Sequence, residues 1–118
     1  MTPKYHRTLT VEKWRGFSFG RQVLMVANEL GRAGSAMTAG DPAEVKRCYE
    51  RALELVCFTL EVAPRRRPLR RELCRFKEVL ASLYVSDHPS IHDNQIAQGV
   101  LISLSPEAFA MLHPRQTQ

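Results

Sequence analysis

Residues 40–55 read GDPAEVKRCYERALEL, and this stretch decides the fold because it marks the end of one helix and the start of the next. The Asp41 carboxylate is suited to cap a helix N-terminus, and Pro42 fits the first helical position, where no backbone N–H is needed. Glu44 follows three residues after the cap, as in a capping box. Gly40 is suited to end the preceding helix, because glycine readily adopts a positive φ there. We therefore predict a helical hairpin with its turn at this point.

Apolar side chains recur three and four residues apart on both sides of this turn, the spacing of helices that bury one face. No segment alternates apolar and polar residues in the manner of a strand. The fold class is therefore predicted to be all-α, a helical bundle of three long helices and a shorter fourth. These helices are expected over residues 18–37, 42–63, 68–84 and 94–103.

Composition divides the chain into an arm, one domain and a tail. Residues 1–16 are polar and cationic, and we expect them to form an N-terminal arm that Trp14 docks onto the core. Residues 17–113 are predicted to form a single helical bundle domain, followed by a polar tail at residues 114–118. The apolar faces of the long helices are extensive for so short a fourth helix. We therefore expect some apolar surface to remain for another subunit, in a homo-oligomer.

One window carries the basic character of the chain, whose net charge is +5. Residues 65–77, RRRPLRRELCRFK, hold seven basic residues and one acidic residue, whereas the rest of the chain holds ten basic and eleven acidic residues. The arginines crowd a helix start, where the backbone already presents partial positive charge. Backbone N–H groups and guanidinium groups together are suited to bind carboxylates or phosphates. The predicted binding residues are Arg65, Arg66, Arg67, Arg70, Arg71 and Arg75.

Two functions fit such a surface. In the first, the chain is a non-enzymatic interaction or accessory protein whose arginine-rich helix start contacts an acidic protein partner. In the alternative, it is a nucleic-acid-binding accessory protein whose arginines contact phosphates with little sequence specificity. A third interpretation has no binding role: the basic turn is only solvated, or is ion-paired with acidic residues across a subunit boundary.

No pattern of catalytic or cofactor-binding residues accompanies these arginines. The six glycines are scattered, so the sequence contains no phosphate-binding loop, and no nucleophile motif occurs. His88 and His92 have the spacing of metal ligands on a helix, but Pro89 and its polar neighbours indicate a loop, and no third ligand is near. We therefore predict that the chain is not an enzyme and has neither a cofactor nor a metal site.

Cys48, Cys57 and Cys74 are widely spaced among apolar neighbours, so we expect buried thiols rather than disulfides or zinc ligands. The N-terminus lacks the apolar segment of a signal peptide, and the longest apolar stretches are too short to span a bilayer. We expect a cytoplasmic location and no membrane partner.

Residues 27–57 resemble a single tetratricopeptide-like helical hairpin. The resemblance rests on Gly40 and Asp41 at the turn, on Tyr49, and on the ending ALEL at residues 52–55. It implies one helix–turn–helix unit. Stable arrays of this kind repeat about every 34 residues, and neither flank of the hairpin repeats the turn or its small residues at that distance. The resemblance therefore implies no peptide-binding array.

The same hairpin resembles HEPN domains, helical bundles that often serve toxin ribonucleases. Their catalytic signature is an arginine followed four to six residues later by a histidine on one helix, and this chain lacks it, so the ribonuclease chemistry is not implied. The histidines that lack the upstream arginine are His6, His88, His92 and His113.

At the level of fold, the chain is also similar to the small, basic four-helix proteins encoded in ribosomal RNA intervening sequences, which assemble into rings.

Overall fold

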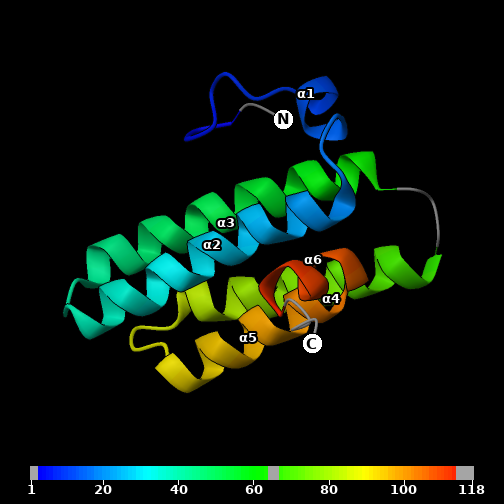
Figure 1. Ribbon diagram of the computed structural model, residues 1–118. Helices are drawn as coiled ribbons and strands as arrows, with labels where there is room; N and C mark the ends of the chain where they lie inside the picture. Colours follow the sequence, from blue (N-terminus) through cyan, green and yellow to red (C-terminus); the bar gives the residue numbers. More distant parts are fainter. Residues whose placement is uncertain (1–2, 64–66, 114–118) are drawn as a thin grey trace.

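The computed structural model describes residues 3–63 and 67–113, which form six α-helices and no strand within that part of the chain (Figure 1). The prediction of an all-α fold is confirmed. Two short helices, α1 and α6, are additional to the four that we expected, and α1 lies within the expected N-terminal arm. The helices are α1 (Val11–Arg15), α2 (Phe19–Thr38), α3 (Pro42–Val62), α4 (Arg67–Val85), α5 (Ile91–Ser103) and α6 (Pro106–Leu112).

The turn between α2 and α3 forms as its sequence predicts. Gly40 has a φ of +71°, in the left-handed region that glycine adopts without steric cost. The backbone N–H of Glu44 donates a hydrogen bond to Asp41 Oδ1 across 3.1 Å, and Pro42 stands in the first turn of α3. The cap therefore places the start of α3 at the expected residue.

The helix α5 begins earlier than expected, at Ile91 rather than Asn94. Ser90 is its N-cap, and Ser90 Oγ accepts a hydrogen bond from the backbone N–H of Asp93 across 3.3 Å. Serine followed three residues later by an acidic residue is a helix-start signal, which the sequence analysis interpreted as part of a polar loop. As a result His92 lies on the helix, and the interpretation of it as a loop histidine is wrong.

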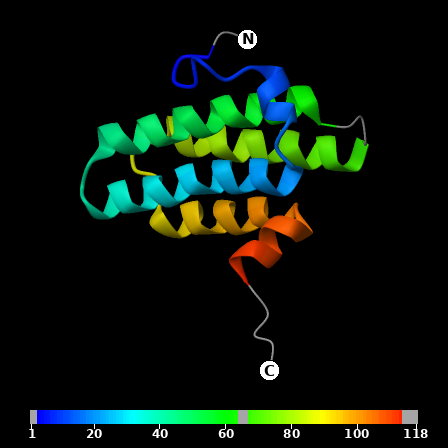
Figure 2. The same cartoon turned by 45° about the horizontal axis from the view of Figure 1, so that its top comes forward.

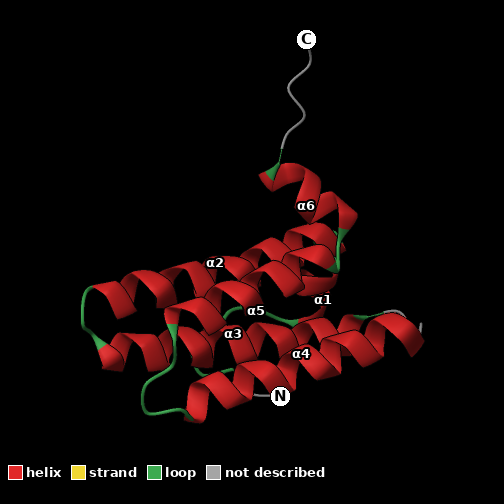
Figure 3. Cartoon of the chain, turned by 90° about the horizontal axis from the view of Figure 1, so that it is seen from below, coloured by secondary structure: helices red, strands yellow, loops and turns green. Residues whose placement is uncertain are grey.

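Four helices, α2 to α5, pack side by side with consecutive helices antiparallel (Figure 1, Figure 2). The helix α2 packs on α3 and α5, α3 also packs on α4, and the contact between α4 and α5 is the sparsest of the four. The short helix α6 packs against α2 and α5, beyond the end of α5 (Figure 3). The largest fully buried aliphatic side chains of the core are Leu30, Leu73, Leu80, Leu101, Val23, Val26 and Val56.

A buried amide joins α5 to both α2 and α3. Asn94 is only 2% exposed, and its Nδ2 donates a hydrogen bond to the Leu30 carbonyl across 2.9 Å. The Tyr49 hydroxyl donates to Asn94 Oδ1 across 2.8 Å. A buried polar side chain is stable only when its hydrogen-bonding groups are paired, so these bonds hold α5 in one orientation.

A second amide lies one turn further along α5. Gln98 Nε2 donates a hydrogen bond to the Ala27 carbonyl across 3.1 Å. Both amides face glycines of α2: a Cβ atom built on Gly31 would lie 3.5 Å from Gln98 Nε2, and one on Gly34 would lie 3.4 Å from Asn94 Nδ2. The small residues thus let α5 approach the α2 backbone closely enough for its amides to reach the carbonyls.

The N-terminal segment is anchored by Trp14 on α1, which is completely buried. Its ring packs edge-on against Phe17, with centroids 5.8 Å apart, and lies 6.4 Å from the ring of Phe58 on α3. Gln22, near the start of α2, donates hydrogen bonds from Nε2 to the carbonyls of Trp14 and Phe17. Trp14 therefore docks α1 onto α3, as its position in the sequence suggested.

Candidate interaction surface

The predicted binding arginines that the structure describes with their side chains all lie exposed on α4. Arg65 and Arg66 fall outside the described residues, and Arg67 is the first residue of α4, with a side chain that is also outside them. The exposed residues are Arg70, Arg71 and Arg75.

Two of these arginines already have partners in the chain. Arg70 Nη1 donates a hydrogen bond to the Leu60 carbonyl across 2.9 Å, in the last turn of α3, where carbonyls lack a helical partner. Arg75 Nη1 pairs with Glu72 Oε1 at 2.8 Å, one turn back on α4. A cation near a helix C-terminus is favourable. Arg70 therefore stabilises the contact between α3 and α4, and it also adds positive charge to the surface.

Lys77 lies in the same basic window but was not among the predicted binding residues. Lys77 and Arg71 are both exposed, and neither makes a hydrogen bond or ion pair to another described residue. We call Arg70, Arg71, Arg75 and Lys77 together the basic face of α4. The opposite face of α4 is apolar and points inward, because Leu73 and the other apolar residues of that face are buried in the core.

The expectation of three buried cysteines is wrong for one of them. Cys48 is buried and Cys57 is partly buried, but Cys74 is exposed. Cys74 follows Leu73 on α4, and successive residues on a helix point about 100° apart, so the burial of Leu73 turns its neighbour toward the basic face. No disulfide joins the three, each of which is a free thiol.

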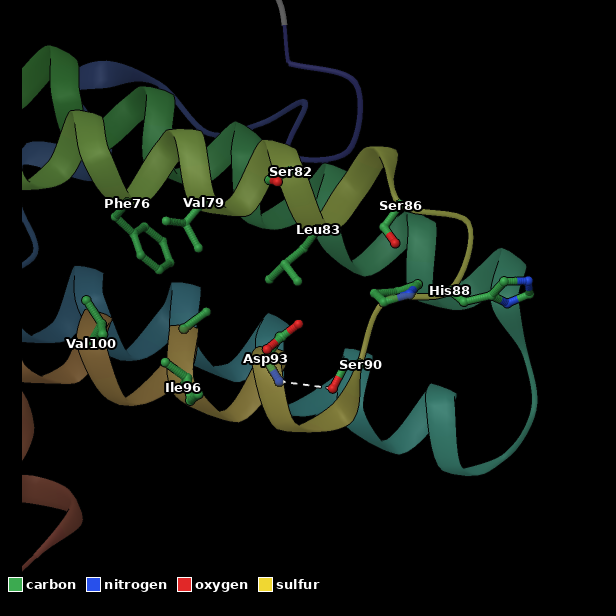
Figure 4. Close-up of a pocket in the computed structure, with 12 residues that line it drawn as sticks. Phe76, Val79, Ser82, Leu83, Ser86, His88, Ser90, Asp93, Ile96 and Val100 are labelled. Carbon is green, nitrogen blue, oxygen red and sulfur yellow. Dashed lines mark hydrogen bonds between the residues drawn. The ribbon is translucent and has the colours of Figure 1, made fainter.

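An apolar groove of about 440 Å³ runs between α4 and α5, where the packing of the bundle is sparsest (Figure 4). Phe76, Val79 and Leu83 line it from α4, and Ile96 and Val100 face them from α5. The side chains of Val79, Ile96 and Val100 are 48%, 51% and 48% exposed. The monomer thus leaves a row of large apolar side chains in contact with water.

The groove ends in polar groups where α4 and α5 are joined. His88 and Asp93 lie at this end together with serine side chains (Figure 4). His88 is in the loop as expected, and within the described residues no three histidine, cysteine or carboxylate side chains lie close enough together to hold a metal ion. Asp93 places a negative charge at this end, which disfavours an anionic ligand there.

An ionic cluster joins α2 to α3. Arg51 Nε pairs with Glu29 Oε2 at 2.9 Å, and Arg51 Nη2 pairs with Glu44 Oε1 at 2.8 Å. Hydrogen bonds from Arg51 and Arg47 lower the pKa of Glu44 to about 2. Burial raises the pKa of the neighbouring Cys48 thiol to about 11. These groups hold their charge states at neutral pH, so the cluster is suited to stabilise the hairpin rather than to exchange protons.

The carboxylate of Glu54, on α3, is covered by the N-terminal arm. Its carboxylate accepts hydrogen bonds from the backbone N–H groups of Lys4, Tyr5 and His6, at 2.9, 3.2 and 2.7 Å. His6 Nδ1 lies 2.7 Å from Glu54 Oε1. The single side chain of Glu54 therefore fixes the path of the arm across α3.

No protein-family model, curated protein or solved structure matches the chain. The resemblance of residues 27–57 to a tetratricopeptide-like hairpin, and the likenesses to HEPN domains and to intervening-sequence proteins, thus stay predictions. None of the helices formed by the described residues is long and apolar enough to cross a bilayer.

Proposed function

We propose that this chain is a non-enzymatic interaction or accessory protein that binds an acidic protein partner through the basic face of α4. The observation that carries the proposal is the exposure of Arg71 and Lys77, which make no hydrogen bond or ion pair to other described residues. Two exposed cations of one helix that have no partner among the described residues are available to carboxylates of another molecule. Arg70 and Arg75 add charge to the same face while keeping their internal partners.

The composition of this face favours a protein over a nucleic acid. Glu72 and Glu78 stand among its basic residues, and they interrupt the continuous positive charge that binding to a phosphate backbone uses. Single-stranded nucleic acids are commonly bound by stacking bases on exposed aromatic side chains. The aromatic side chains of α4, Phe76 and Tyr84, are buried and partly buried.

A fluorescence-anisotropy titration tests the proposal with three labelled probes of matched length: a helical peptide of glutamate and leucine, a single-stranded RNA and a duplex DNA. We expect the peptide to bind at 150 mM salt and the nucleic acids to bind only at low salt, because phosphate contacts are strongly salt-dependent. Nucleic-acid binding that persists at 150 mM salt without peptide binding would contradict the proposal. It would favour the alternative, a nucleic-acid-binding accessory protein that contacts phosphates through the basic face of α4.

Charge reversals then locate the binding surface. Arg71→Glu and Lys77→Glu are each expected to weaken peptide binding about tenfold, which corresponds to about 1.4 kcal/mol. Arg15→Glu is the matched control, since Arg15 is exposed on α1, away from α4. Arg70 is left unchanged because its bond to α3 would confuse a loss of binding with a loss of stability. Equal effects of all three reversals would show only a response to net charge and would overturn the proposal.

A further inference from the structure

The helix α5 carries apolar side chains on its groove side as well as on its buried side. Leu101 and Ile102 are buried against the bundle, while Ile91, Ile96 and Val100 are exposed. Ile96 and Val100 are four residues apart, so they lie one above the other on the side of α5 that lines the groove. In the monomer α2, α4 and α6 contact α5, but they leave the side chains of Ile96 and Val100 about half exposed. The sequence of α5 therefore indicates a second apolar neighbour along the α4–α5 groove.

The groove carries charges of opposite sign at its two ends. Residues 71, 75, 79, 82 and 86 follow one another at helical spacings of three and four, so Arg71 and Arg75 continue the stripe that runs through Val79 along the groove. Arg75 is paired with Glu72, which leaves Arg71 as the described cation available at this end. Asp93 stands at the other end, close to the loop between the two helices (Figure 4).

This arrangement is complementary to itself. Asp93 lies opposite Leu83 across the groove (Figure 4), and Arg71 lies twelve residues before Leu83 on α4, about 18 Å away along the helix. A two-fold axis perpendicular to α4, midway along this distance, crosses α4 at the level of residue 77, about 3 Å before the level of Val79. This axis places the Arg71 end of each copy against the Asp93 end of the other, so the same charge contact forms at both ends of the interface. The two apolar rows pack against each other at the centre.

We propose that the α4–α5 groove is the interface of an antiparallel homodimer, in which a second copy of this chain covers the exposed row of Val79, Ile96 and Val100. A purely acidic peptide complements the Arg71 end but is repelled by Asp93 at the other. A second copy offers both signs in the required order, together with an apolar centre. The dimer leaves Lys77 outside the interface, because that residue lies off the stripe formed by Arg71 and Val79.

Sedimentation velocity of the full chain, from 1 to 100 µM, tests the dimer directly. We expect the wild type to sediment as a species with twice the mass of one chain, which is 13.5 kDa. Ile96→Asp and Val100→Asp are expected to weaken dimerisation at least tenfold. Met111→Asp is the matched control, because Met111 is a similarly exposed apolar residue on α6 that does not line the groove. Circular dichroism establishes that each variant remains folded.

The orientation of the two copies has its own test. Arg71→Asp or Asp93→Lys alone is expected to weaken dimerisation, and the double variant is expected to restore it, because each exchanged charge then meets its opposite across the axis. A monomeric wild type, equal losses from Ile96→Asp and Met111→Asp, or a double variant weaker than both single variants would each overturn the proposal. Arg71 belongs to both proposed surfaces, so the second copy and the acidic peptide compete for it. Lys77→Glu separates the two proposals: it is expected to leave the dimer intact while weakening binding of the acidic peptide.

Discussion

The indole N–H of Trp14 donates a hydrogen bond to Thr59 Oγ1 across 3.1 Å, and both residues are buried. The Thr59 hydroxyl in turn donates to the Leu55 carbonyl across 2.8 Å, one turn back on α3. A single hydroxyl group therefore satisfies the buried tryptophan of α1 while remaining bonded within its own helix. This contact fastens the N-terminal segment to the bundle.

Thr59→Val keeps the shape of the side chain but removes the acceptor of the indole N–H. We expect it to lower the free energy of unfolding by about 1–3 kcal/mol, the usual cost of leaving a buried donor unpaired. Urea denaturation followed by the fluorescence of Trp14, the single tryptophan of the chain, measures the change. Thr59→Ser retains the hydroxyl and serves as the control. A valine variant as stable as the serine variant would contradict the role given to this bond.

Glu54 is expected to control how tightly the N-terminal arm is held. Burial alone would raise the pKa of Glu54, but hydrogen bonds from the backbone N–H groups of His6 and Tyr5 outweigh it and hold that pKa below its usual value. Glu54→Gln removes the charge that accepts these bonds. We expect hydrogen exchange at the amides of residues 4–6 to become faster in this variant, as measured by NMR, while Trp14 fluorescence stays unchanged.

The matched control for the arm is Glu50→Gln. Glu50 pairs with Lys4 at 3.7 Å, and the lysine side chain is largely exposed, so this pair contributes little. Exchange at the arm amides is expected to stay at the wild-type rate. Because the folded pKa of Glu54 is depressed, its contribution is present above the unfolded pKa and is lost as the pH falls through the folded pKa. Exchange in the wild-type arm should therefore accelerate in acid.

We predict that protonation of Glu44 in acid destabilises the hairpin formed by α2 and α3. Its pKa lies at about 2 rather than 4.5, so its pairing stabilises the fold fully above pH 4.5, and this contribution is lost as the pH falls toward 2. Glu44→Gln should therefore lower the melting temperature at pH 7 and have progressively less effect between pH 4.5 and 2. Glu61→Gln, an exposed change on the same helix, is expected to have no such profile. A pH-independent difference between wild type and Glu44→Gln would argue against the pairing.

Asn94→Ala is expected to destabilise the bundle by about 1–3 kcal/mol, because it leaves the Leu30 carbonyl and the Tyr49 hydroxyl without their buried partner. Tyr49→Phe should lower the free energy of unfolding by less, because it removes the hydroxyl group itself and leaves no buried hydroxyl without a partner. In the double variant the two effects should be less than additive, as for residues that share a bond. Gln95→Ala, on the exposed side of α5, is the control. Additive losses measured by urea denaturation would show that Tyr49 and Asn94 act independently.

Local signals in the sequence predicted the helix starts more successfully than they predicted the surfaces. Asp41 caps α3 as expected, because a cap depends on residues three apart in one segment. Thr10 caps α1 with the same chemistry, but the cationic composition of the arm concealed it. The missed start of α5 at Ser90 has a similar origin, in a segment that was judged by its overall polarity.

The candidate surface depended on contacts that no local pattern contains. The arginine window predicted a basic helix start, but nothing in it indicates that Arg70 binds a carbonyl of α3 or that Lys77 has no internal partner. The groove was missed because it forms between two helices, each of which has an ordinary apolar pattern. Its one visible sign was the pair of Ile96 and Val100 on one side of α5, which indicates a further neighbour only after the packing of the other sides of the helix is known.

The two amides of α5 also determine which side chains the protein shows to water. Rolling α5 about its axis would turn Ile96 and Val100 toward the interior, but it would pull Asn94 and Gln98 away from the carbonyls of α2. The hydrogen bonds therefore act against the rearrangement that hydrophobic burial alone would favour. An isolated subunit cannot hide these side chains by adjusting itself, and a change in their exposure has to come from a second molecule.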